Sequence, residues 1–184
     1  MTYHNFPTID DSSEEDLRKN NQYDDSNLLW FLNGSTDGAG HMKKTYRDVL
    51  LSRVGVKAYK EFFRILSLDN KVTYFHCSQG KDRAGLGAYM FLTALGVSEE
   101  DKRIDYLQSN EAMKIKIKQL KAMLKDKPFY NKEYERALNE VFACDESYLD
   151  FALDAVKKEF GSLENYMKEV LEVDFERLRE LYLE

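Results

Sequence analysis

Proline and cysteine are scarce in this chain, whose 184 residues include 2 prolines, 9 glycines and 2 cysteines. So little proline and glycine disfavours an all-β fold, which needs frequent tight turns. Two cysteines are too few for a disulfide scaffold. No run approaches the ~18 apolar residues of a membrane-spanning helix, and residues 1–16 lack the apolar stretch of a signal peptide. We therefore expect a cytoplasmic protein with reduced thiols and no integral membrane segment.

Basic charge is also not in excess. Lysine and arginine number 27 and aspartate and glutamate 33, which gives a formal net charge of −6. A nucleic-acid binder normally needs a basic face that displaces counterions from phosphates, so we expect no nucleic-acid partner. The length and the 43% of hydrophobic residues fit one globular domain over residues 1–184.

Helical periodicity dominates what is present. Apolar residues recur at spacings of three and four from 42 to 68, where Gly55 is expected to interrupt the pattern, and again from Ala84 to Leu95. Gly96 has the position of a helix stop. Residues 98–184 are expected to form a helical C-terminal part that opens on a capping box, Ser98-Glu99-Glu100-Asp101.

Lysines crowd the predicted helix at 112–125. Such a run is most often a solvated face whose aliphatic stems cover apolar surface. The alternative is a basic rim that binds an anionic ligand.

One short segment has the character of a strand. Val72-Thr73-Tyr74-Phe75 is rich in β-branched and aromatic residues and is flanked by turn-forming residues on both sides. We predict a buried strand there. The expected fold class is therefore α/β, with a small central sheet surrounded by helices and helices in the majority.

The segment most informative for function is His76-Cys77-Ser78-Gln79-Gly80-Lys81-Asp82-Arg83-Ala84-Gly85, between the predicted strand and the following helix. A strand–loop–helix junction aims several backbone N–H groups at one point, and the helix dipole adds positive potential there. Residues 76–85 are therefore a predicted phosphate-binding loop.

Cys77 and Arg83 stand at the two ends of this loop. If the loop wraps around a phosphate, the thiol faces the phosphorus and the guanidinium grips two of its oxygens. The same surroundings lower the pKa of a cysteine from about 8.5 to about 3.5–7.5. A thiolate can attack phosphorus and form a cysteinyl-phosphate, which water hydrolyses. Gly80 lets the backbone approach the ligand without a Cβ.

Three further loop residues have open assignments. Asp82 is a candidate proton donor to the leaving oxygen, and its structural alternative is a salt bridge or a helix N-cap. Lys81 is expected to add positive charge at the pocket mouth or simply to be solvated. His76 is expected to support the loop through hydrogen bonds of its ring. Cys144 is expected to be a small buried hydrophobic residue.

The loop resembles that of the cysteine-dependent protein tyrosine phosphatases, and more narrowly the bacterial branch whose loop reads His-Cys-x-x-Gly-Lys-Asp-Arg-Thr-Gly. The resemblance covers most of the chain, including residues 95–101, 105–110 and 160–166. It implies a nucleophile at Cys77, a phosphate clamp at Arg83 and an in-loop acid at Asp82. It also implies substrate contacts from Ser78, Gln79, Gly80, Lys81, Ala84 and Gly85.

The resemblance further implies the substrates and the absence of a cofactor. Members of the family act without a metal or other cofactor on phosphotyrosine, and some act on phosphoserine, phosphothreonine or phosphoinositides. Lys81 would be a cation that widens the substrate range toward phosphoinositides. A phosphorylated protein or a phosphoinositide is therefore the expected partner.

The chain departs from the family pattern in two ways. Ala84 stands where the family has a hydroxyl residue that helps the sulfur leave, so we expect a slow second step. The chain also looks short at its N-terminal side, so the sheet can lack strands there, and a second copy of the chain could fill the gap as a homodimer. The alternative functions are a phosphate-binding pseudophosphatase with little turnover and sulfur transfer through a persulfide on Cys77.

Overall fold

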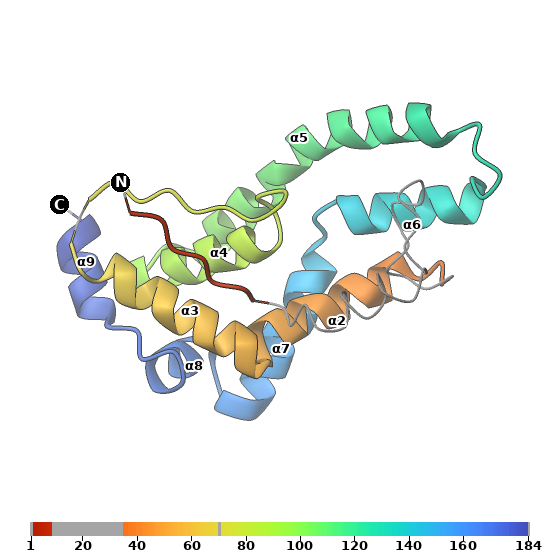
Figure 1. Cartoon of the computed structure of the whole chain (residues 1–184). Helices are drawn as coiled ribbons and strands as arrows, with labels where there is room; N and C mark the ends of the chain where they lie inside the picture. The colour runs from red at the N-terminus through yellow and green to blue at the C-terminus, as the bar shows by residue number, and fades with distance from the viewer. Residues whose placement is uncertain (1, 9–34, 70, 184) are drawn as a thin grey trace.

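A computed structural model describes residues 2–8, 35–69 and 71–183 of the chain. Helices carry the regular structure of these ranges (Figure 1). They are α2 (Gly38–Leu51), α3 (Arg53–Leu66), α4 (Arg83–Leu95), α5 (Glu99–Leu124), α6 (Lys132–Phe142), α7 (Glu146–Phe160), α8 (Leu163–Glu169) and α9 (Phe175–Tyr182). The predicted helical character of the C-terminal part is confirmed.

Most helix starts are set by one polar side chain. The hydroxyl of Ser98 accepts a hydrogen bond from the backbone N–H of Asp101 at 3.1 Å, so the predicted N-terminal cap of α5 is confirmed. The same kind of bond starts α6 at Asn131 and α9 at Asp174. Gly96 ends α4 with a φ of 85°, a left-handed conformation that glycine adopts without strain, as its sequence position predicted.

The expected break at Gly55 lies elsewhere. The chain turns at Ser52, which separates α2 from α3 and whose hydroxyl accepts a hydrogen bond from the N–H of Gly55 at 3.1 Å. Gly55 itself lies in the first turn of α3. A Cβ atom there would lie 1.9 Å from the backbone oxygen of Val49. Glycine is therefore required at this position by a close backbone approach, and it does not interrupt the helix.

The predicted central sheet is wrong for the part of the chain that the structure describes, because no strand is present in residues 2–8, 35–69 or 71–183. Residues 71–77 are extended, but no backbone–backbone hydrogen bond links Val72–Cys77 to another described residue. The prediction of burial also fails, since Val72 is 103% exposed and Tyr74 79% exposed. Strand propensity alone makes an extended segment, and a sheet also needs a neighbour to pair with.

The helices pack as two connected groups. One group is centred on α2, which contacts α3, α6 and α7, and the other on α4, which contacts α5, α8 and α9. One hydrophobic core includes residues of both groups, among them the buried Tyr46 of α2, Leu149 of α7 and Leu86 of α4. This packing places the N-terminus of α4, and the loop before it, beside α2, α5 and the end of α6.

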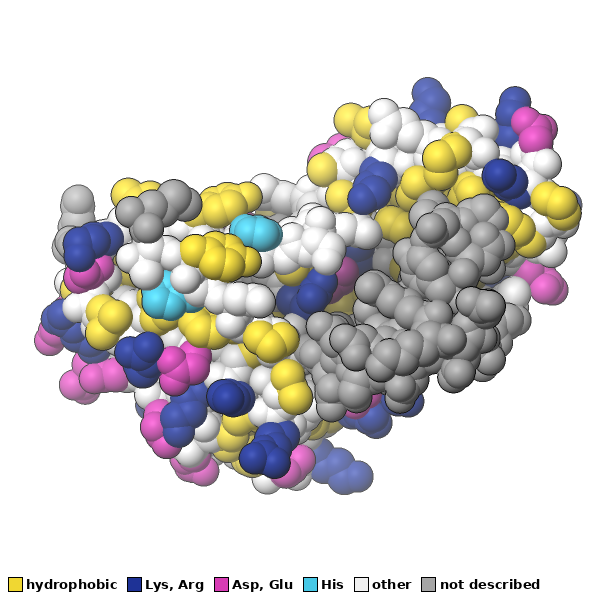
Figure 2. Space-filling view, viewed as in Figure 1, with side chains coloured by type: hydrophobic (Ala, Val, Ile, Leu, Met, Phe, Trp, Pro, Cys, Tyr) yellow, Lys and Arg dark blue, Asp and Glu magenta, His cyan; other side chains and the backbone are white. Residues whose placement is uncertain are grey.

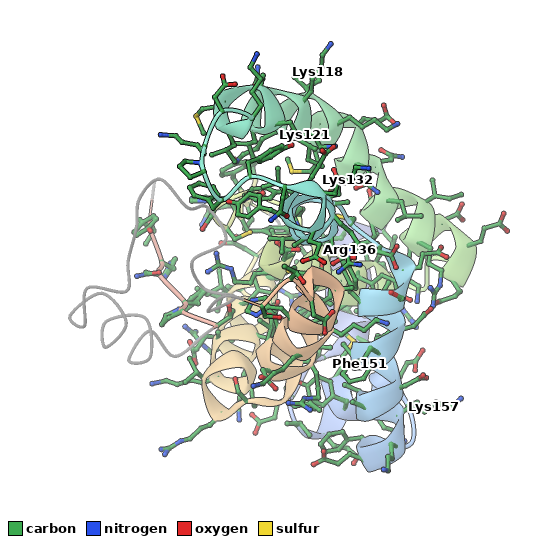
Figure 3. The ribbon with its side chains drawn as sticks, turned by 90° about the vertical axis from the view of Figure 1, so that its right-hand side faces the viewer. Lys118, Lys121, Lys132, Arg136, Phe151 and Lys157 are labelled. Carbon is green, nitrogen blue, oxygen red and sulfur yellow. The ribbon has the colours of Figure 1, made fainter. Side chains whose placement is uncertain are left out.

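The helices α5 and α6 form an antiparallel arm that carries the lysine-rich segment (Figures 1 and 3). Lys114 pairs with Glu111 at 2.6 Å, and Lys121 pairs with Glu135 at 2.8 Å. Lys118 is exposed. These contacts favour the solvated-face interpretation of this segment over a basic rim. None of the described helices is both long and apolar enough to cross a membrane.

Candidate active site

The loop that joins the extended segment to α4 makes a short turn at Gly80, and a hydrogen bond from α3 holds its C-terminal end. Gly80 has a φ of 75°, in the left-handed region, and an added Cβ would meet no atom within 4 Å. Its backbone conformation therefore favours glycine, although the space there is open. The hydroxyl of Tyr59 in α3 donates a hydrogen bond to the backbone oxygen of Arg83 at 2.8 Å, which fixes the start of α4.

The sulfur of Cys77 lies inside this turn. The backbone groups of Ala84, Gln79 and Gly80 lie around it. Partial burial raises the pKa of the Cys77 thiol, but these backbone groups and the nearby Arg83 guanidinium lower it, and the net pKa is below its ordinary value. The loop therefore favours a thiolate at the start of the helix.

Arg83 returns to the same centre as Cys77. Its Nη2 donates a hydrogen bond to the hydroxyl of Ser78 at 2.8 Å, which closes the loop across its two ends. Arg83 is partly exposed at the surface and Ser78 is exposed. The structure thus brings Arg83 close to both Ser78 and Cys77.

Lys81 points into the protein rather than toward the loop mouth, and this differs from both expected positions. The side chain is 1% exposed, so it is not solvated. Its ammonium donates hydrogen bonds to the backbone oxygens of Val141 at 3.0 Å and Ala143 at 3.4 Å, at the C-terminal end of α6. The ammonium also pairs with Asp82 at 2.7 Å. Lys81 therefore ties the loop to α6.

Asp82 accepts two hydrogen bonds on one oxygen. Its Oδ1 receives the Lys81 ammonium at 2.7 Å and the hydroxyl of Tyr46, from α2, also at 2.7 Å. Asp82 occupies the N-cap position of α4, but its side chain makes no cap hydrogen bond. The salt bridge that was its structural alternative is thus present, while the side-chain cap is not. The carboxylate retains 23% exposure.

The remaining loop residues have distinct surroundings. The Nδ1 of His76 lies 3.2 Å from the backbone oxygen of Cys77, which is the kind of ring contact expected of it. The Oε1 of Gln79 is buried without a hydrogen-bond partner among the described residues. A Cβ on Gly85 would lie 3.6 Å from the ring of Tyr106, so this helix face packs closely on α5.

The structure adds residues that sequence reasoning missed. Tyr46, Tyr59 and Tyr106 donate to or surround the loop from α2, α3 and α5. In the sequence these tyrosines are ordinary members of apolar helical patterns, and nothing marks their hydroxyls as partners of a loop far away in the chain. Cys144 is 5% exposed, as predicted, and burial raises the pKa of its thiol.

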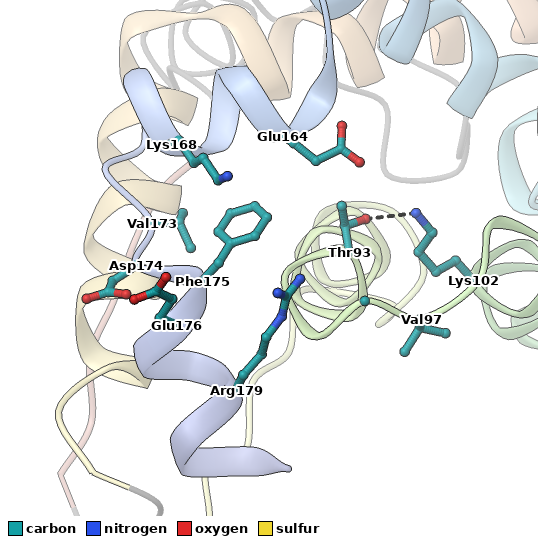
Figure 4. A pocket seen from close by; sticks show the side chains of 11 residues that line it. Thr93, Val97, Lys102, Glu164, Lys168, Val173, Asp174, Phe175, Glu176 and Arg179 are labelled. Atoms are coloured by element: carbon teal, nitrogen blue, oxygen red, sulfur yellow. Dashed lines mark hydrogen bonds between the residues drawn. The ribbon is translucent and has the colours of Figure 1, made fainter.

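A cavity of about 590 Å³ lies at the opposite end of α4 from the loop (Figure 4). Its lysine and arginine side chains are engaged in structural contacts. Lys102 donates to the hydroxyl of Thr93 at 3.0 Å and pairs with Glu99 at 3.0 Å. The Nε of Arg179 donates to the backbone oxygen of Ala94 at 2.8 Å, near the C-terminal end of α4. No cysteine, serine or histidine is among the described residues that line this cavity, so the candidate site is the loop.

Comparison with known proteins agrees with the geometry of the loop. The family model described as "Tyrosine phosphatase family" matches residues 1–184. The chain is also similar to a protein of Cupriavidus necator named "Putative tyrosine-protein phosphatase H16_A0669", with 35% identity over 136 residues. That match covers 69% of this chain and 45% of the relative, so the chain spans about half the length of the curated relative. The chain belongs to the tyrosine phosphatase family.

Proposed function

We propose that this chain hydrolyses phosphomonoesters, with phosphotyrosine as the first substrate class, through a cysteinyl-phosphate on Cys77. The observation that carries the proposal is the surroundings of the Cys77 sulfur, which lies among the backbone groups of Gln79, Gly80 and Ala84 and near the Arg83 guanidinium that closes the loop on Ser78. Donors arranged in this way stabilise a thiolate and bind the oxygens of a phosphate. The family to which the chain belongs supports the same reaction class.

In the first step, the thiolate of Cys77 attacks phosphorus, and a sulfur–phosphorus bond forms. The bond from phosphorus to the ester oxygen breaks, and the leaving oxygen takes a proton from the carboxylic acid form of Asp82. The guanidinium of Arg83 and the loop N–H groups stabilise the negative charge on the phosphoryl oxygens during the transfer.

In the second step, water attacks the phosphorus of the cysteinyl-phosphate. Asp82, now ionised, takes a proton from that water, the sulfur–phosphorus bond breaks, and Cys77 returns as a thiolate with release of inorganic phosphate. A hydroxyl at position 84 would stabilise the leaving sulfur, and Ala84 has none. We expect this step to limit turnover.

The position of Lys81 favours phosphotyrosine over phosphoinositides. A phosphoinositide carries several phosphates and needs cations that reach outward from the site. The ammonium of Lys81 instead bonds backbone oxygens at the end of α6 and the carboxylate of Asp82. An aryl phosphate needs only one anion site, and the loop supplies it. Phosphoinositides are the alternative substrate class.

A second candidate function is phosphate binding with little turnover. Ala84 favours it, because a cysteinyl-phosphate that forms but does not hydrolyse leaves the protein occupied. The two functions differ in the time course of product release. A burst with a slow steady rate supports hydrolysis, and a burst with no steady rate supports the binding module.

The test is hydrolysis of para-nitrophenyl phosphate by the wild type, Cys77→Ala and a matched control, Cys144→Ala. Cys144 is buried and its pKa is raised, so its removal is expected to leave the rate within about twofold of the wild type once folding has been checked. Cys77→Ala is expected to lose the rate entirely. Equal rates in the wild type and Cys77→Ala would remove the proposal.

We also propose that a second copy of the chain pairs along residues 71–76. Val72 and Tyr74 are exposed there, and the backbone of Val72–Cys77 makes no backbone–backbone hydrogen bond to described residues. Figure 2 shows hydrophobic and histidine side chains together where this segment runs in Figure 1. An exposed apolar edge of this kind is a template for pairing with another strand.

A further inference from the structure

Tyr46 is the residue outside the loop that holds Asp82. Its hydroxyl donates a hydrogen bond to Oδ1 of Asp82 at 2.7 Å, and the side chain of Tyr46 is 0% exposed. The ring packs edge-on against Tyr106 at 6.3 Å and Tyr148 at 6.0 Å between centroids. A tyrosine packed on two sides cannot follow a moving carboxylate, so it fixes where that carboxylate lies.

A second tyrosine stands behind the first. The hydroxyl oxygens of Tyr46 and Tyr106 are 2.9 Å apart. A tyrosine hydroxyl carries one proton, and that of Tyr46 is directed to Asp82. Between the two tyrosines, Tyr106 is then the one that can donate. Its hydroxyl also lies 3.3 Å from the backbone oxygen of Asp145, which competes for the same proton. When Tyr106 donates to Tyr46, that bond polarises and strengthens the bond from Tyr46 to Asp82.

We propose that Tyr46, supported by Tyr106, is a positioning residue that sets Asp82 for proton transfer to the leaving oxygen. This inference rests on the proposed function, because it assigns Tyr46 a part in the step in which the ester bond breaks. Tyr46 itself touches neither substrate nor phosphoryl group and acts only through Asp82.

The two carboxylate oxygens of Asp82 differ in their hydrogen bonds, and this difference supports the role of Tyr46. Oδ1 accepts both the Tyr46 hydroxyl and the Lys81 ammonium, whereas no hydrogen bond joins Oδ2 to a described residue. In the acid form, Oδ1 remains the acceptor and Oδ2 carries the proton. The two donors thereby select which oxygen delivers the proton, and the 23% exposure of the side chain leaves it accessible.

Tyr46 remains a donor across the working pH range. Burial, followed by the nearby Asp82 and Tyr106, raises the pKa of Tyr46 well above its ordinary value. The hydroxyl is therefore neutral and keeps its proton for the bond to Asp82. Lys81 provides a positive charge beside the same oxygen, and Tyr46 fixes the position of that oxygen through its hydrogen bond.

The test compares two substrates that differ in their need for an acid. Phenyl phosphate releases phenol, whose pKa is near that of the tyrosine side chain, about 10. Its phenoxide is a poor leaving group, so its departure needs a proton. Dinitrophenyl phosphate releases a stable anion that needs none. Tyr46→Phe is expected to lower kcat/KM for phenyl phosphate by about 10- to 100-fold, the loss of one hydrogen bond to a charged group. The value for dinitrophenyl phosphate is expected to change less than about twofold.

Tyr166→Phe is the matched control, because it removes a fully buried hydroxyl that donates to the backbone oxygen of Leu50 and does not contact Asp82. Its two kcat/KM values are expected to fall equally or not at all. Inhibition by inorganic phosphate reports on the loop alone, and it is expected to be the same in the wild type and Tyr46→Phe. Circular dichroism checks that each variant folds.

One further variant keeps the result decisive if Tyr46→Phe does not fold. Tyr106→Phe retains Tyr46 and removes the hydroxyl behind it, which also contacts the backbone oxygen of Asp145, so the same selective loss is expected at smaller size. If Tyr46→Phe folds, adding it to Asp82→Asn, which lacks the acid, is expected to cost nothing further.

Each outcome points to one conclusion. An equal loss for both aryl phosphates in Tyr46→Phe, or no loss for either, overturns the inference while leaving the proposed function intact. Absence of Cys77-dependent hydrolysis in the wild type overturns both. A loss confined to phenyl phosphate, absent from the Tyr166→Phe control, supports the inference.

Discussion

The ammonium of Lys81 donates a hydrogen bond to the backbone oxygen of Val141 at 3.0 Å, which joins the loop of residues 76–85 to the last turn of α6. The C-terminal end of a helix carries partial negative charge, and its last carbonyls have no partner within the helix. A buried cation satisfies both needs at once. The middle of the loop is therefore held by a distant helix, and its shape depends on the packing of α6.

Replacement of Lys81 by methionine tests this anchor. The variant removes the Lys81 ammonium from two backbone oxygens and leaves the Asp82 carboxylate with the Tyr46 hydroxyl as its donor. Because Asp82 is partly exposed and water can reach it, we expect a loss of about 2–3 kcal/mol in the free energy of unfolding, less than for a fully buried pair. Urea denaturation followed by circular dichroism measures the loss.

Lys118→Met is the matched control for this change. Lys118 is exposed on α5 (Figure 3), so its removal is expected to alter the free energy of unfolding by less than about 0.5 kcal/mol. Equal effects of the two substitutions would mean that Lys81 does not anchor the loop.

Ala84→Thr tests the missing hydroxyl. If hydrolysis of the cysteinyl-phosphate limits turnover, a hydroxyl near the departing sulfur is expected to raise the steady rate by about tenfold, the effect of one hydrogen bond to a charged partner. The burst that precedes it is expected to keep its amplitude. Stopped-flow release of para-nitrophenol measures both phases, and an unchanged steady rate would place the slow step elsewhere.

The two cysteines are expected to differ in their pH dependence toward iodoacetamide. The loop N–H groups and Arg83 lower the pKa of Cys77 below that of an ordinary cysteine, so its reactive thiolate persists to lower pH than that of a free thiol. Burial raises the pKa of Cys144, so that thiol stays protonated and inert at neutral pH. Peptide mass spectrometry is expected to find alkylation at Cys77 alone at pH 7. Arg83→Met is expected to move the midpoint for Cys77 upward, and preferential labelling of Cys144 would contradict the assigned surroundings.

Pairing along residues 71–76 predicts a dimer that one charge disrupts. Tyr74→Lys places an ammonium on the exposed apolar face of the segment and is expected to give a monomer. Ile115→Lys, at another exposed apolar residue, which lies on α5, is expected to leave the dimer unchanged. Light scattering coupled to size-exclusion chromatography measures the mass. A wild-type monomer at every concentration would rule out the pairing.

Much of the loop could be predicted because its features are local. The spacing of Cys77 and Arg83, the glycine with a positive φ and the start of a helix just after them lie within a few residues of one another. The cap at Ser98 and the stop at Gly96 are local in the same way. Such features depend on short-range geometry, which a sequence displays directly.

The errors concern long-range partners. Val72–Phe75 has strand propensity, but a ladder needs a second strand, and none is present among the described residues. The inward turn of Lys81 depends on where α6 ends, 60 residues further along the chain. Tyr46 likewise meets Asp82 across 36 residues. Propensity and spacing carry no information about these long-range contacts, because tertiary packing determines which residues meet.

The most direct test of the central claim is mass spectrometry of the protein mixed with an aryl phosphate and quenched in acid. The account predicts one added phosphoryl group, located on the sulfur of Cys77, and more of it in the wild type than in Ala84→Thr because the second step is slow without the hydroxyl. Steady hydrolysis without any phosphoryl group on Cys77, and undiminished in Cys77→Ala, would contradict it.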